Sequence, residues 1–162
     1  MIEHGKILVS SDFSEQSSEA LRRAVVLARQ FEAEVHLLHV LEPMLIYGAE
    51  MASLSPGQEI AETMHDGAKR DGARKRLQKQ AEQVGFNVQT HLEETMMKPA
   101  QGICKFAQTL PADLIVIGRY GHSGLLGHLL IGSNAERVVR YAPCSVLVAK
   151  PHSILADEKV RG

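Results

Sequence analysis

A glycine-rich segment is the part of this chain whose residue types and spacing best suit binding chemistry. It covers residues 118–134, follows the apolar run 114–117 and precedes a helical pattern over 135–140. Glycine lets the backbone approach an anion closely because no Cβ stands in the way. Amide groups at the start of a helix point outward, and the helix dipole favours negative charge there. The segment therefore predicts a phosphate-binding loop, with a nucleotide as the best-suited ligand.

The predicted phosphate contacts come from backbone amides and from a few side chains of this segment. Ser133 offers a hydroxyl donor or a helix cap, and Arg119 and His122 offer positive charge to a polyphosphate. Solvent exposure without a ligand is the alternative for both charged residues. The segment is neither a Walker A loop nor a dinucleotide fingerprint, which would follow the first strand. The candidate phosphate set is Gly118, Arg119, Gly121, His122, Gly132, Ser133 and Asn134.

Asp12, at the end of the first predicted strand, is the candidate for the nucleoside end of the ligand. A carboxylate there can accept hydrogen bonds from a ribose hydroxyl or an adenine amino group, or hold Mg²⁺ through water. The alternative is a local turn in which Asp12 accepts bonds only from N–H groups near Ser14.

Catalytic and metal-binding patterns are weaker than the binding pattern. The histidines and cysteines do not have the spacing of a zinc site. Hydrolysis of a nucleotide needs a positioned water and charge neutralisation, yet the loop carries no lysine and no second carboxylate. The sequence therefore predicts binding rather than turnover, with slow ATP cleavage at most.

Apolar periodicity predicts strands that alternate with helices along the chain. Near-continuous apolar runs such as 35–40, 114–117 and 146–149 are typical of a parallel sheet covered on both faces. Right-handed crossovers then give a doubly wound α/β sheet, which binds ligands where the winding reverses. Asp12 and Gly118 should meet at that point. The predicted strands are 6–10, 34–40, 86–93, 113–118 and 145–149, and the predicted helices are 14–30, 55–84, 99–110 and 133–141.

Composition limits the partners that the chain can attract. The 162 residues predict one domain over 1–150 and a polar tail over 151–162. A net charge of −1 and the lack of Trp argue against nucleic acid. The basic run 69–76 is typical of a solvated helix face.

No apolar run approaches the ~20 residues that cross a bilayer. With no signal peptide, and with Cys104 and Cys144 expected as reduced thiols, we expect a cytoplasmic protein.

Several segments together resemble the universal stress protein family. The glycine-rich loop is similar to that family's nucleotide-binding signature, Gly-x2-Gly-x9-Gly-Ser/Thr, although ten residues rather than nine separate Gly121 from Gly132. Ser10 stands where many members carry Pro. The other similar segments are 6–15, 34–40, 98–103, 112–118 and 142–148, so the resemblance covers about residues 5–150.

The resemblance implies a five-stranded, Rossmann-like sheet of order 3-2-1-4-5 that binds ATP or AMP, with Mg²⁺ when the triphosphate is bound. It also implies that Asp12 contacts the nucleoside and that the backbone of Val40 meets the adenine edge. Antiparallel pairing of the strand 145–149 with its copy would form a homodimer. The alternative is a dimeric interaction module that binds no nucleotide.

Overall fold

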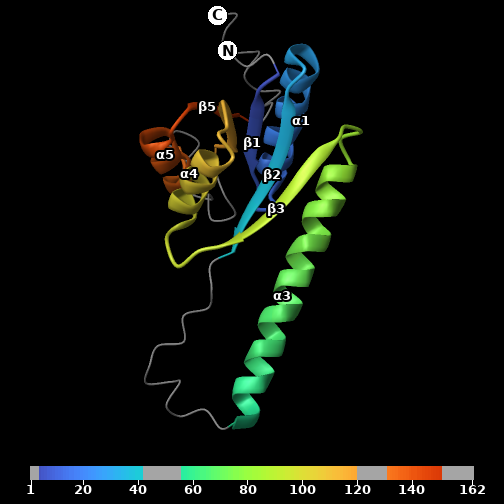
Figure 1. Cartoon of the computed structure of the whole chain (residues 1–162), viewed down its shortest axis with the longest axis vertical. Helices are drawn as coiled ribbons and strands as arrows, with labels where there is room; N and C mark the ends of the chain where they lie inside the picture. Colours follow the sequence, from blue (N-terminus) through green and yellow to red (C-terminus); the bar gives the residue numbers. More distant parts are fainter. Residues whose placement is uncertain (1–3, 42–55, 120–130, 151–162) are drawn as a thin grey trace, which may run out of the picture.

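The computed structural model describes residues 4–41, 56–119 and 131–150, with the side chains of 56–66 left undescribed. Strands and helices alternate along these residues, as the sequence predicts (Figure 1). In chain order the elements are β1 (Lys6–Ser10), α1 (Glu15–Phe31), β2 (Glu34–Leu41), α3 (Pro56–Glu82), β3 (Val88–Glu94), α4 (Pro99–Thr109), β4 (Leu114–Gly118), α5 (Ser133–Tyr141) and β5 (Ser145–Ala149).

The strands form one parallel sheet of order β3-β2-β1-β4-β5. This confirms the predicted doubly wound α/β fold and its strand order. β1 lies in the centre and pairs with both β2 and β4, so the chain reverses its winding direction at β1. β3 and β5 are the two edges of the sheet.

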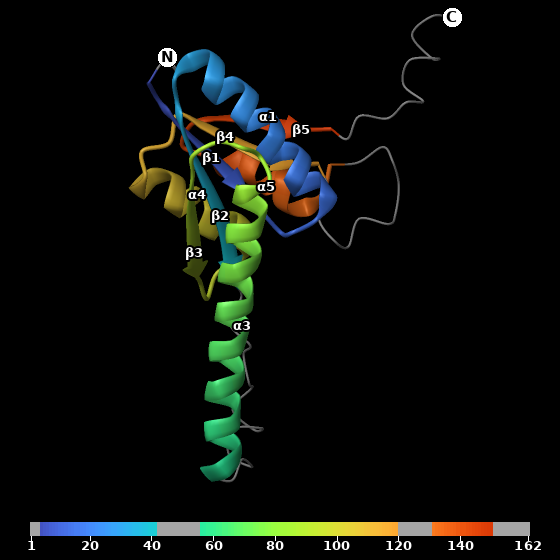
Figure 2. The same ribbon diagram turned by 90° about the vertical axis from the view of Figure 1, so that its right-hand side faces the viewer.

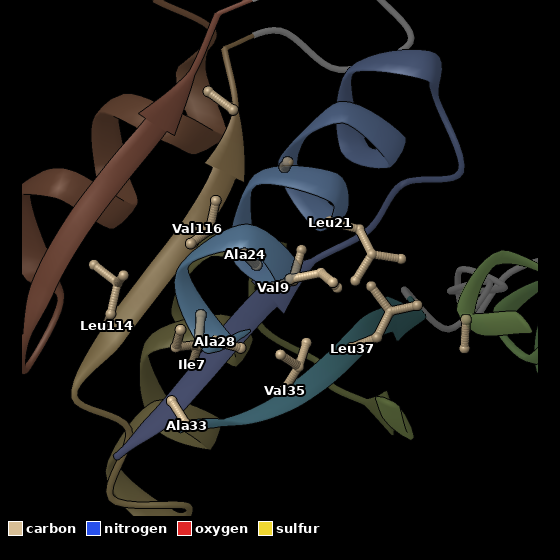
Figure 3. Close-up of a cluster of buried hydrophobic side chains, with 14 of the residues drawn as sticks. Ile7, Val9, Leu21, Ala24, Ala28, Ala33, Val35, Leu37, Leu114 and Val116 are labelled. Carbon is tan, nitrogen blue, oxygen red and sulfur yellow. The ribbon is translucent and has the colours of Figure 1, made fainter. Parts of the chain in front are cut away.

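One face of the sheet packs against α1 and the C-terminal part of α3. α1 buries a stripe of small and branched residues because its apolar positions follow the helical repeat. Ile7, Val9 and Leu37 of the strands meet this stripe and are fully buried (Figure 3). Removing that apolar surface from water is the main contribution of this face to folding.

The opposite face packs against α4 and α5. Leu8, Leu38 and Ile115 point to this side, in alternation with the residues of the first face. Ile103 of α4 and Val138 of α5 complete the second cluster. Right-handed crossovers on both sides of β1 place the helices in these two layers.

α3 is much longer than the strands it accompanies, and its N-terminal part extends away from the sheet (Figures 1 and 2). The helix begins at Pro56, as expected for proline in a first turn. It ends at Glu82, two residues before the predicted end, and Gly85 then adopts a left-handed backbone with φ of 56°. Its C-terminal part docks through Ala73, Leu77 and Ala81, which are buried.

Two further sequence expectations can be compared with the structure. No helix among the described residues is long and apolar enough to cross a membrane. Cys104 is buried in α4, Cys144 is half-buried directly before β5, and neither forms a disulfide.

Candidate functional site

The carboxyl ends of β1, β2 and β4 meet at one edge of the sheet. Gly118 ends β4 and lies against the first turn of α1, which follows β1. A Cβ built on Gly118 would lie 3.1 Å from the carbonyl carbon and the Cβ of Gln16. Residues about a hundred positions apart in the sequence therefore come together, as the topology requires.

Asp12 occupies the turn between β1 and α1 and is half-buried. Its Oδ1 accepts hydrogen bonds from the backbone N–H of Ser14, at 3.0 Å, and from the Ser14 hydroxyl. Ser14 in turn caps α1, because its hydroxyl oxygen accepts a bond from the N–H of Ser17. Asp12 thus forms the local turn that was the alternative to a ligand contact, and its Oδ2 is the oxygen outside these bonds.

Ser11 fixes this turn to two other elements. Its N–H donates to the Leu38 carbonyl at 2.8 Å, and its carbonyl accepts from Nδ1 of His39 at 2.7 Å. Its hydroxyl is 2.6 Å from Oε1 of Gln80 on α3 and accepts from the N–H of Phe13. Ser11, Ser17 and Gln80 are all buried, so these bonds form a polar network inside the molecule.

Phe13 lies at the centre of a small group of π-systems and charges. Its backbone is left-handed, with φ of 64°, which is uncommon for a bulky residue. Its ring is 4.2 Å from the ring of His39, centroid to centroid, and Cζ of Arg76 lies 4.1 Å from the ring centroid. Non-glycine residues in this conformation gather at functional sites, because surrounding contacts must hold them there.

His39 is held as a neutral donor–acceptor group at this edge. The carbonyl of Ser11 only accepts, so Nδ1 carries the proton and Nε2 is an acceptor. Burial lowers the pKa of His39 below its ordinary value of 6.5, and the nearby charge of Arg76 adds to this effect. The hydrogen bond to Ser11 and the charge of Asp12 oppose the shift without reversing it.

The first turn of α5 presents amide groups at the same edge. Gly132 is the N-cap, and among the described residues no side chain caps the helix. This differs from the expected cap at Ser133, which is instead the first helical residue. The N–H of Gly132 donates to the Arg119 carbonyl at 2.8 Å, which holds the start of α5 next to the end of β4. The amides of Ser133 and Asn134 thus begin a helix that has no capping acceptor within the described part of the chain.

The structure brings together most of the predicted site residues that it describes. Asp12, Gly118, Arg119, Gly132, Ser133 and Asn134 lie at or beside the carboxyl edge, whereas Gly121 and His122 lie outside the described residues. Val40 is near the end of β2, and the β1–β2 pairing stops at Ser10↔Leu38, two residues before it. Its side chain packs toward Gly102 of α4, which leaves its backbone as the part available to a ligand.

Sequence reasoning missed the contributions of Phe13, His39, Arg76 and Gln80. The run 69–76 was expected to be a solvated helix face, yet Arg76 within it contacts the ring of Phe13. The available signal was the helical repeat: residues 69, 73, 76, 77 and 80 share one side of α3, and three of them are buried. Within the described residues, no group of three or more His, Cys, Asp or Glu is placed to hold a metal ion.

Several known proteins are similar to this chain in sequence and in fold. The model of the universal stress protein family matches residues 3–150. A universal stress protein of Methanocaldococcus jannaschii is 37% identical over 147 residues, which are 90% of this chain and 81% of that protein. The solved universal stress protein UspA of Lactobacillus plantarum is 29% identical with a TM-score of 0.67, covering 91% of this chain and 99% of the other.

Two more distant solved structures are complexes with nucleotides. One is the universal stress protein of Archaeoglobus fulgidus in complex with dAMP, 21% identical with a TM-score of 0.61 over 93% of this chain and 100% of that one. The other is a universal stress protein in complex with cAMP, 18% identical with a TM-score of 0.64 over 91% and 97%. These two share the fold. Given its match to the family model over nearly its whole length, the chain belongs to the universal stress protein family.

Proposed function

We propose that this chain is a regulator that binds an adenine nucleotide, ATP or AMP, at the carboxyl edge of β1, β2 and β4. The phosphates lie against the first turn of α5, and the nucleoside lies toward Asp12 and the backbone of Val40. Mg²⁺ accompanies the triphosphate. Hydrolysis is slow or does not occur, because the glycine-rich segment 118–134 carries no lysine to neutralise the phosphates and no carboxylate to orient a water.

The observation that carries this proposal is the uncapped first turn of α5 beside the turn that holds Asp12. Helix N-terminal amides and the helix dipole favour an anion, and no side chain of the described residues caps this turn with a hydrogen bond. The complexes of two family members with dAMP and cAMP support the nucleoside part. Glu136 in the first turn opposes an anion, so the amides and the glycine-rich segment must outweigh its charge.

A proline at position 133 tests the phosphate contact, because it removes a single amide without breaking the helix. Ser133 is the first helical residue, where proline is well tolerated, and ψ of 150° at Gly132 suits a residue before proline. Loss of a hydrogen bond to a charged group costs about 1.5–3 kcal/mol. We expect calorimetry to show ATP binding about ten-fold or more weaker in Ser133→Pro.

Ser133→Ala is the matched control, since it removes the hydroxyl and keeps the amide. If the amide binds phosphate, Ser133→Ala should bind ATP much more tightly than Ser133→Pro. Equal affinities for ATP in the wild type and in Ser133→Pro would contradict the phosphate placement.

We also propose a homodimer formed by antiparallel pairing of β5 with its copy. β5 is a sheet edge of five residues, and Val146, Leu147 and Val148 are half-buried. An apolar edge strand tends to be covered or paired. The same observation favours a second candidate function, a dimeric interaction module without nucleotide. An unfolding midpoint unchanged by ATP and Mg²⁺ would favour that module, since ligand at a hundred times its Kd adds about 2.7 kcal/mol.

A further inference from the structure

Arg76 of α3 reaches the candidate site from the side opposite to α5. α3 packs against β2 and β3, whereas Gly118 and α5 lie on the β4 side of β1. In the proposed placement, a nucleotide whose phosphates meet the first turn of α5 extends its nucleoside across β1 toward Asp12 and Val40, and so toward β2. The guanidinium above Phe13 lies in that direction, next to the turn that holds Asp12.

The guanidinium of Arg76 is available to a ligand. The residue is exposed although its Cζ lies 4.1 Å from the ring centroid of Phe13. Among the residues that the structure describes, no carboxylate forms a salt bridge with Arg76, and no acceptor takes a hydrogen bond from it. Its five N–H donors and one face of its plane are therefore not committed to another described residue.

The charges around His39 place Arg76 and Asp12 in one small region. Arg76, Asp12 and Lys69 each act on the pKa of His39, two from α3 and one from the β1–α1 turn. His39 precedes Val40, whose backbone is the proposed contact for the base edge. The group is thus composed of a cation, two π-systems and a carboxylate at the nucleoside end.

We propose that Arg76 is a base-binding residue whose guanidinium stacks on the purine ring of the nucleotide, beside the ring of Phe13. A guanidinium is planar and weakly hydrated, so it stacks on aromatic faces more readily than an ammonium group does. A purine presents a larger π-face than a pyrimidine, so this contact favours purine nucleotides. The inference rests on the proposed nucleotide binding and adds the residue that recognises the base.

Titration of Arg76→Ala with three ligands tests this assignment, because each ligand carries a different part of ATP. Calorimetry would measure adenosine, ATP and inorganic tripolyphosphate. A stacking contact of ordinary strength predicts a loss of roughly three- to thirty-fold for adenosine and for ATP alike. Tripolyphosphate should bind Arg76→Ala and the wild type equally. The matched control is Arg74→Ala, which removes the same charge from the same helix but lines the α3–β3 groove.

Combining Arg76→Ala with Phe13→Leu separates a direct contact with the base from an indirect effect on the β1–α1 turn. In Phe13→Leu the ring that supports Arg76 is missing, so a residue that acted only by holding Phe13 would have nothing left to hold. A direct contact predicts that Arg76→Ala still weakens adenosine binding in this background, and that Arg76→Lys restores only part of the affinity.

The outcomes distinguish this inference from the proposed function. A wild type that binds neither ATP nor adenosine would overturn both. A wild type that binds ATP, with Arg76→Ala and Arg74→Ala equal to it, would overturn the base contact alone. A loss for ATP and tripolyphosphate but not for adenosine would also overturn it, because Arg76 would then act on phosphate.

Discussion

At the residue scale, the turn after β1 depends on bonds that span the sequence. Ser14 was predictable as a cap because a serine before an apolar helical repeat is a local signal. The partnership of Ser11 with Gln80 was not predictable, because 69 positions separate them and only the packing of α3 brings them together. The left-handed backbone of Phe13 was equally hidden, since its type gives no sign of that conformation.

Ser11→Ala should destabilise the fold although it removes one oxygen. The change leaves Oε1 of Gln80 and the N–H of Phe13 without their partner inside the protein. An unsatisfied buried polar group costs about 1–3 kcal/mol. Urea unfolding would measure this loss. The control is Ser133→Ala, which changes an exposed serine and should leave the free energy of unfolding equal to that of the wild type. Equal midpoints for Ser11→Ala and the wild type would show that the network contributes nothing to stability.

Gly118→Ala and Gly72→Ala should shift stability in opposite directions. A Cβ at Gly118 would lie 3.1 Å from Gln16, closer than ordinary contact, and overpacking costs about 1–3 kcal/mol. At Gly72, within α3, nothing lies within 4 Å, and alanine should stabilise the helix by about 0.5–1 kcal/mol. Thermal unfolding would measure the change in stability of both variants. A Gly118→Ala variant more stable than the wild type would contradict the close approach of β4 to α1.

At the element scale, the strands and helices could be predicted from the sequence, because strands that are buried on both faces of a sheet consist of nearly continuous apolar residues. β1 and β5 have the predicted bounds, and β4 differs by one residue. β3 begins two residues later than predicted, because Phe86 packs against the core before the chain joins the sheet. The cap of α5 lies at Gly132 rather than at Ser133, because serine is the more common cap and residue type alone does not show which of two neighbours takes the position.

The pairing of β2 with β3 should make stability depend on pH. Nε2 of His36 lies 3.2 Å from the Glu34 carboxylate, so Nδ1 accepts from Nε2 of His91 at 3.0 Å. Burial lowers the pKa of both histidines below 6.5, and at His36 this effect outweighs the Glu34 carboxylate, which raises the pKa. The unfolded chain therefore binds protons first as pH falls. Stability should be complete above about pH 6.5 and decrease as pH drops through the folded-state pKa values.

Urea unfolding at about pH 7.5 and about pH 5.5 measures this loss. His91→Gln keeps an N–H donor for His36 and removes one titrating group, so its stability should change less between the two pH values. A wild-type stability that rises on acidification would contradict the assigned direction of these pKa shifts.

At the scale of the whole molecule, the edge position of β5 makes the proposed homodimer testable without unfolding the sheet. The carbonyl of Ala149 accepts a hydrogen bond from the N–H of Arg119, so the backbone N–H and C=O of Ala149 face the β4 side of β5. Successive residues alternate, so the amide of Val148 faces outward, where proline is tolerated on an edge strand. Val148→Pro should be monomeric by light scattering at micromolar concentration, whereas Val148→Thr should remain a dimer. A monomeric wild type would contradict this pairing.

Whether a nucleotide binds at the carboxyl edge of the sheet can be decided by titrating the ¹⁵N-labelled protein with ATP and Mg²⁺ and following the amide chemical shifts. A nucleotide bound at the carboxyl edge should cause its largest shifts at Ser133 and Asn134 of α5 and over residues 12–14 of the β1–α1 turn, and these shifts should saturate together. Unchanged amides there, or shifts confined to the α3–β3 groove around Thr90, would contradict a nucleotide site at the carboxyl edge of the sheet.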